Sequence, residues 1–305
     1  MLITSIIFSK DRALQLDLTL KTIKQNFVLC DSVVVLYKTS EQEHEESYEN
    51  LKTEHPNVSF YKQSCSIFFD ILSIINNSTS DYICFFTDDD IVYRKADITE
   101  DNLYQLFHLA DDSGEPVDVV CLSLRLGLNT TKRDFGGGLL DDKMPSSVLR
   151  PTSLLSSPLF LWGFTSLPAG GYWSYPLSVD GHIFKKETIL TFCIELEILN
   201  KHYENMGEPR EKWCWKQNPN EFESKLQRFY FDVPNAMAAL EISCVVNSPN
   251  NKVQNQIPNR FGNDFSYAAA DLNNHYKSGK RLDVNNINFD NIVCPHQEID
   301  ILEGL

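Results

Sequence analysis

Strand-like and helix-like segments alternate over the first 90 residues of this 305-residue chain. Four apolar or β-branched runs predict strands, at residues 3–8, 32–37, 57–62 and 82–86. Apolar residues three and four positions apart predict helices over 12–25 and 66–77. Strands that alternate with helices form a parallel sheet covered on both faces. The sequence therefore predicts an α/β, Rossmann-like fold with a mostly parallel central sheet flanked by helices.

Two polar segments follow predicted strands directly. "SKDR" (9–12) comes after the first strand, and "TDDD" (87–90) comes after the fourth. Ligands of such sheets bind beyond the carboxyl ends of the strands. We therefore expect these two segments to form part of one ligand crevice.

The three adjacent aspartates, Asp88, Asp89 and Asp90, raise a problem of charge. In an extended segment Asp88 and Asp90 would share one side and Asp89 would face the other. Two carboxylates about 5 Å apart repel by roughly 3 kcal/mol at an effective dielectric of about 20. A divalent cation, Mg²⁺ or Mn²⁺, held by Asp88 and Asp90 would offset this repulsion. The alternative is an acidic turn that water solvates.

Composition excludes some classes of function. The formal net charge is −15 without a Lys/Arg cluster, which disfavours binding of DNA or RNA. The eight cysteines form no C-x-x-C pair, and neither a signal peptide nor a membrane-spanning run is found. We expect a reduced, cytoplasmic protein, for which peripheral contact with a membrane stays open.

The second half is less regular. It contains a predicted strand or strand pair at 117–128, a strand followed by a helix over 178–196, a helix from 218, and a last buried strand at 242–247. Residues 134–173 are rich in Gly, Ser and Pro, with aromatics between them, which favours an active-site loop or lid. No linker separates the halves, so we expect one continuous domain.

Two segments resemble the GT-A glycosyltransferases, closest to their large family-2-like group. They are "SIIFSKDRALQLDLTLKTI" (5–23) and "SDYICFFTDDDIVY" (80–93), the second matching the DxD region. The resemblance implies a nucleotide-diphospho-sugar donor and Mn²⁺ or Mg²⁺. It also implies a nucleotide-sugar-binding half at 1–130 and, at 131–305, an acceptor-binding half with the C-terminal tail.

The resemblance implies roles for individual residues at the donor. Asp90 would ligate the metal, Asp88 would contact the ribose or a metal-bound water, and Asp89 would support one of them. The other donor-binding residues would be Ser9, Lys10 and Arg12, near the base or the diphosphate. For Arg12 the alternative is an exposed residue in the first turn of a helix. Family members commonly carry an acidic residue after the second strand, where it contacts the base. This chain departs from that pattern and reads "YKTS" (37–40), which leaves the base unassigned, and a UDP-sugar is only the default donor.

The resemblance also implies a catalytic base in "NPNEFESKL" (218–226). Glu223 is the first choice, Glu221 the second, and Asp180 is a third carboxylate that would touch the acceptor. The alternatives are a cap of the helix, with Asn220 three residues before Glu223, and a turn aspartate before Gly181. His296 would be a late metal or diphosphate ligand, although a lone His is more often structural. Aromatic side chains that would stack on a sugar, or fill the core instead, are Trp162, Trp173 and Tyr175.

The predicted function is metal-dependent, inverting transfer of a sugar to a hydroxyl acceptor such as a glycan, in surface glycan or polysaccharide synthesis. Three alternatives stay open. A sugar nucleotidyltransferase should have a Gly-rich phosphate loop after its first strand, and "FSKDRALQL" (8–16) contains no Gly. A non-catalytic carbohydrate- or nucleotide-binding protein would keep the fold, and a glycoside hydrolase would need two carboxylates and no cation.

Overall fold

The computed structural model describes most of the chain, namely residues 2–64, 66–111, 113–135, 138–149, 158–208, 218–229, 236–253 and 267–305. None of the helices in these ranges combines the length and apolarity needed to span a bilayer.

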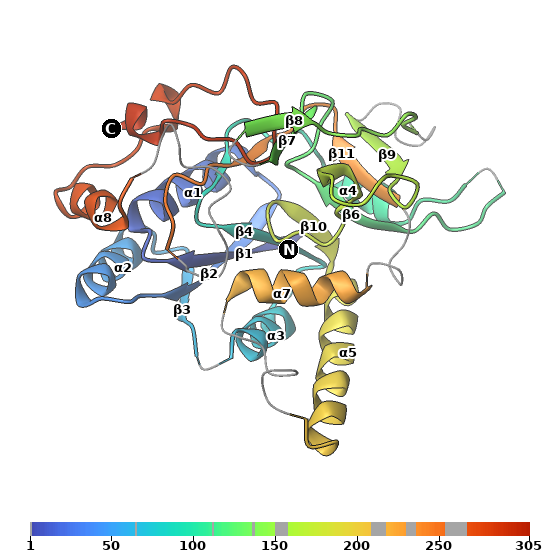
Figure 1. Cartoon of the computed structure of the whole chain (residues 1–305), viewed down its shortest axis with the longest axis horizontal. Helices are drawn as coiled ribbons and strands as arrows, with labels where there is room; N and C mark the ends of the chain where they lie inside the picture. The colour runs from blue at the N-terminus through green and yellow to red at the C-terminus, as the bar shows by residue number, and fades with distance from the viewer. Residues whose placement is uncertain are drawn as a thin grey trace.

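An eight-stranded sheet forms the centre of the molecule, in the order β3-β2-β1-β4-β10-β6-β11-β9 (Figure 1). Four of its seven neighbouring pairs are parallel; β10 runs antiparallel to both of its neighbours, and β9 is antiparallel to β11. The predicted α/β fold with a mostly parallel central sheet is confirmed. Its strands are β1 (Ile3–Lys10), β2 (Cys30–Lys38), β3 (Ser59–Lys62), β4 (Tyr82–Thr87), β6 (Val119–Ser123), β9 (Leu159–Gly163), β10 (His182–Lys185) and β11 (Ala236–Leu240).

Helices cover both faces of this sheet and form two cores. Alternate residues of β1 show why, since Ile3 and Ile7 face one core while Ile6 and Phe8 face the other. The first core contains residues of α1 (Ala13–Asn26), α2 (Gln42–Glu54), α4 (Glu100–Phe107) and α8 (Ala269–Lys277). The second contains residues of α3 (Ile67–Asn77), α5 (Lys186–Asn205) and α7 (Pro219–Leu226), which lie below the sheet in Figure 1.

Helix α1 is buried along nearly all of its first half, including the polar Gln15 and Asp17. The sheet covers one side of it. The other side contacts α8 and the small ribbon of β5 (Asp90–Val92) and β12 (Val245–Asn247). The helix is therefore enclosed by segments from both ends of the chain.

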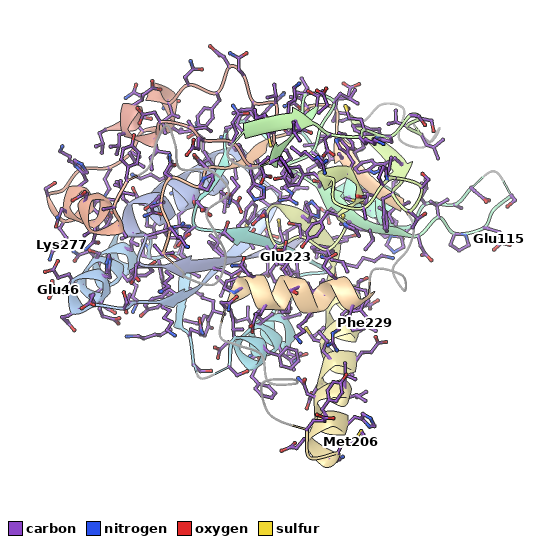
Figure 2. All side chains as sticks on the ribbon, in the orientation of Figure 1. Glu46, Glu115, Met206, Glu223, Phe229 and Lys277 are labelled. Carbon is purple, nitrogen blue, oxygen red and sulfur yellow. The ribbon has the colours of Figure 1, made fainter. Side chains whose placement is uncertain are left out.

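The predicted long loop at 134–173 contains regular structure. It holds the hairpin of β7 (Lys132–Phe135) and β8 (Gly138–Asp141), then β9, and residues 150–157 lie outside the described ranges. Helix α5 projects away from the sheet, with Met206 at its free end (Figure 2). The short 3-10 helices are η2 (Tyr172–Ser174), η3 (Gln227–Phe229), η4 (Val284–Asn286) and η5 (Ile301–Gly304).

Two predicted strands differ from the structure. The run at 117–128 forms only the five-residue β6. The predicted last core strand at 242–247 contributes β12, which pairs with β5 outside the main sheet, while the adjacent β11 lies inside it. Strand β11 is "AMAAL", whose small side chains give a weak apolar signal.

Strand register brings distant segments to one edge of the sheet. Phe8 pairs with Thr87 in the β1–β4 ladder, so Ser9 and Asp88 follow side by side. Strand β10 starts at the same edge, where Gly181 N–H donates to Phe85 O at 2.8 Å. Gly181 has φ +67°, a conformation that favours glycine, and it lets the chain turn into β10 directly after Asp180.

Candidate active site

A cavity of about 510 Å³ lies at the edge where β1 and β4 end, within the roughly 300–1,000 Å³ of ligand pockets. Both halves of the chain line it. Six of its lining residues are lysine or arginine although the whole chain is strongly acidic: Lys10, Arg12, Lys38, Arg125, Arg133 and Lys252. Five are carboxylates: Asp88, Asp89, Asp134, Asp180 and Glu223.

The turn between β1 and α1 is fixed onto the first aspartate of the triplet. Ser9 Oγ and the backbone N–H of Lys10 each donate to Asp88 Oδ2 at 2.8 Å. Asp11 adopts a left-handed conformation with φ +56°, and its carboxylate accepts hydrogen bonds from the backbone N–H and the hydroxyl of Ser40. The structure thus joins three of the predicted donor residues, Ser9, Lys10 and Asp88.

The aspartate triplet forms a turn and not an extended segment. Strand β4 ends at Thr87 and β5 begins at Asp90, so side chains do not alternate as expected. Asp88 and Asp89 face the same cation, since Arg12 Nη1 lies 2.8 Å from Asp88 Oδ1 and 2.7 Å from Asp89 Oδ2. The expectation that Asp88 and Asp90 share a side, opposite Asp89, is therefore wrong. The side chain of Arg12 is 10% exposed, so the alternative of an exposed first-turn residue is wrong too.

Asp90 lies behind the cavity and does not line it. Its carboxylate is fully buried, with Oδ2 2.8 Å from the Thr87 N–H and Oδ1 3.1 Å from Asn247 Nδ2. Burial, and then the charges of Asp180 and Asp89, raise the pKa of Asp90 well above its ordinary value. Burial also raises the pKa of Asp88, to about 6, against the opposing charge of Arg12. These carboxylates therefore hold protons more tightly than solvated ones.

Asp180 is the centre of a second charged group. Its Oδ2 lies 2.9 Å from Arg125 Nη1 and 3.3 Å from His296 Nε2. The other ring nitrogen of His296 is hydrogen-bonded to Tyr172 OH at 2.7 Å. Both nitrogens of His296 are therefore engaged, and a metal could bind it only in place of one partner. The predicted role of His296 as a ligand remains a prediction.

Glu223 lies on α7, as labelled in Figure 2, and is half-buried at the cavity wall. Its Oε1 accepts a hydrogen bond of 3.1 Å from the backbone N–H of Val179. Burial raises its pKa to about 7; the charge of Asp180 adds to this shift and that of Arg125 opposes it. A carboxylate with such a pKa is suited to exchange protons near neutral pH.

Other predicted site residues are not all brought to the cavity. Glu221 does not line it, and the cap of α7 is Asn218, whose Oδ1 accepts from Glu221 N–H at 3.0 Å, and not Asn220. Trp162 and Trp173 are 1% and 0% exposed, and their rings pack at 4.9 Å in the core. These two are not available to stack on a sugar. Tyr175 does line the cavity.

Three residues that were not predicted organise the site. Arg125 neutralises Asp180, Asn247 bonds to Asp89 and Asp90, and Asn251 accepts from Arg12. Arg125 could have been found, because an Arg inside the apolar run "VVCLSLRLGL" (119–128) needs a buried partner. The two asparagines lie at the end of a strand and in a polar loop, where nothing distinguishes them from solvated residues.

The described residues that line this cavity do not bring together three His, Cys, Asp or Glu ligand atoms. Arg12 Nη1 already lies between Asp88 Oδ1 and Asp89 Oδ2, at 2.8 and 2.7 Å, so a divalent ion could bind both carboxylates only if Arg12 moved. In the described part of the chain, such a group of ligand atoms, all within 4.8 Å, exists at Asp17, Glu54 and His55. There the carboxylates bind Lys21 and Arg281.

Fold and cavity together define an α/β protein with a crevice of mixed charge beyond the carboxyl ends of its parallel strands. No protein-family model and no curated protein match the sequence.

Solved structures with a similar fold include glycosyltransferases. S. aureus TarS is 13% identical with a TM-score of 0.44, and the match covers 82% of this chain but only 37% of TarS. A complex of TarS 1–349 with UDP gives the same identity and TM-score and is 62% covered. The mannosyltransferase PcManGT from Pyrobaculum calidifontis, in complex with GDP-Man and Mn²⁺, is 16% identical with a TM-score of 0.27; the match covers 45% of this chain and 43% of that one.

The solved structure of a synthase has a similar fold as well. The 4-diphosphocytidyl-2C-methyl-D-erythritol synthase from Anaerococcus prevotii is 10% identical with a TM-score of 0.38. The match covers 79% of this chain and 86% of the synthase.

Proposed function

We propose that this chain is a GT-A glycosyltransferase that moves a sugar from a nucleoside-diphosphate donor to a hydroxyl acceptor. The observation that carries the proposal is the composition of one cavity. The cavity is lined by the basic turn after β1 and by two carboxylates from the second half of the chain, Asp180 and Glu223. The similarities to solved structures are too distant to support the proposal.

The donor would bind at the turn after β1. Lys10 and Arg12 belong to this turn, and Lys38 ends the neighbouring β2. A diphosphate carries negative charge that an acidic protein repels overall, so a local group of cations is needed to attract and hold it. The predicted UDP-sugar is the default donor, and the predicted Mn²⁺ or Mg²⁺ remains a prediction.

The acceptor would bind between the donor and α7. Sugar transfer proceeds through an oxocarbenium-like state, and the acceptor hydroxyl must lose its proton as it attacks. Glu223 is the proposed base because its raised pKa lets it take that proton near neutral pH. Asp180 is held by Arg125 and His296, so it would orient the acceptor. Attack assisted by a single base predicts inversion at the anomeric carbon.

The test is a screen of nucleoside-diphosphate sugars for slow hydrolysis in a buffer that contains Mn²⁺. We expect release of the nucleoside diphosphate and free sugar from one donor. In a parallel assay supplied with pyrophosphate, formation of a sugar 1-phosphate together with a nucleoside triphosphate would instead indicate the nucleotidyltransferase alternative. A chain that binds a donor without turning over any donor or acceptor would be the non-catalytic binding protein.

A further inference from the structure

Arg12 occupies the place between the two cavity-facing aspartates. Its Nη1 lies 2.8 Å from Asp88 Oδ1 and 2.7 Å from Asp89 Oδ2. The side chains of Arg12 and Asp89 are each 10% exposed and that of Asp88 is 4% exposed. The cation that offsets the repulsion between these carboxylates is thus part of the protein.

The guanidinium is held on its other sides as well. Nε lies 2.6 Å from Asn251 Oδ1, and Nη2 lies 2.6 Å from the backbone carbonyl of Asn251. Gln15 Nε2 donates to the same Oδ1 at 3.1 Å. All three guanidinium nitrogens therefore have partners, and the group cannot leave the aspartates without breaking several charge-assisted hydrogen bonds.

The charge of Arg12 is permanent. Burial acts to lower its pKa, but the charges of Asp89 and Asp88 outweigh burial, and the pKa is raised above its ordinary value. With Arg12 in place, the pair carries at most one net negative charge. A doubly charged ion would bind this pair less favourably than two unpaired carboxylates, because the negative charge of the pair is already half neutralised. It would also have to displace a guanidinium.

We propose that Arg12 is the resident cation of the Asp88–Asp89 pair, and that a nucleoside diphosphate binds this cavity without a divalent ion. This inference rests on the proposed function, because that function supplies the ligand. Arg12 holds the pair in position, and the diphosphate would contact the lysines that line the same cavity, Lys10, Lys38 and Lys252.

The test is calorimetry of UDP, GDP, CDP and ADP binding to the full chain, once with Mn²⁺ and once with EDTA. We expect one of them to bind in EDTA with a Kd within about threefold of its value in Mn²⁺. Binding in Mn²⁺ alone would overturn the role of Arg12 and leave the proposed function intact. Absence of binding in both buffers would overturn the proposed function itself.

Variants of Arg12 provide the second arm. Arg12→Met keeps the apolar stem and removes the charge, and we expect the Kd in EDTA to rise at least about tenfold. Arg94→Gln is the matched control, since Arg94 is exposed and does not line the cavity. Unchanged affinity of Arg12→Met in EDTA would contradict the proposal. If this variant does not fold, the comparison of EDTA with Mn²⁺ on the wild type still decides.

Discussion

Charged side chains around the cavity find their partners in distant parts of the chain. Arg12 meets Asp88 and Asp89 across 76 and 77 positions, and Arg125 meets Asp180 across 55. The sequence indicated the aspartates because they follow a strand that ends at the ligand edge. It did not indicate the partners, because these ion pairs join segments that lie far apart in the sequence, and the pattern of one segment does not specify which distant segment packs beside it. The sequence also did not indicate the turn after Thr87, which places Asp90 behind the cavity.

The pKa of Glu223 leads to a prediction for pH dependence. A base must be ionised, so kcat/KM should rise with pH between about pH 5 and pH 9, with its midpoint near the pKa of about 7. Glu223→Gln should lower kcat by about 10²–10⁴-fold and remove this acidic limb. The measurement is a pH–rate profile of both proteins.

Two comparisons make this result specific. Glu221→Gln removes the same charge from the same helix outside the cavity, so it should keep the wild-type profile. The pKa of Glu223 is raised in the folded state from an ordinary 4.5, so its contribution to stability grows as the pH falls through 7. Protonation of Glu223 would therefore not unfold the protein at low pH, so such unfolding cannot explain a fall in kcat/KM there. An acidic limb that persists in Glu223→Gln would contradict the assignment.

Among the elements, those with a strong apolar period were predicted well. The strands β1, β2, β3 and β4 and the helices α1 and α3 lie within a few residues of their predicted bounds. Helix α2 was not predicted, because its buried positions include His44, Ser47 and Tyr48 beside a single Leu51. A helix whose buried face is half polar shows only a weak apolar stripe in its sequence.

Helix α7 carries Glu223 and depends on its first turn. Asn218 caps it, Pro219 is its first residue, and Phe222 packs at 5.6 Å from the ring of Phe85. Asn218→Ala should cost about 1 kcal/mol of stability, whereas Asn218→Asp should cost less, since Asp is as good a cap. Urea unfolding followed by circular dichroism measures both. Equal stability of Asn218→Ala and wild type would show that the cap contributes nothing.

For the whole molecule, the central sheet takes strands from both halves of the chain, and α1 is enclosed by segments from both ends. A set of ion pairs ties these segments together. Asp17 on α1 is fully buried and lies 2.8 Å from His55 Nε2 and 2.6 Å from Lys21 Nζ. Glu54 beside it binds Arg281, and Lys277 of α8 lies 3.5 Å from Glu46 of α2 (Figure 2).

Asp17 should contribute more to the free energy of unfolding than the exposed charged residues near it. Asp17→Ala leaves the partly buried His55 without its acceptor, and we expect a loss of about 3 kcal/mol. Glu54→Gln should cost less than about 1 kcal/mol, because both members of its pair reach solvent. Guanidinium unfolding of the two variants provides the comparison. A smaller loss for Asp17→Ala than for Glu54→Gln would contradict this assignment.

Strand β10 has a consequence for how the chain is made. It fills the gap between β4 and β6 and runs opposite to both, yet it is synthesised about 60 residues after β6. Until Lys185 has left the ribosome, one edge of β4 in the nascent chain has no partner strand. Strands of other chains can pair with such an exposed edge. Assembly of the sheet must therefore wait for the later half, and a chain interrupted near residue 130 should associate with copies of itself.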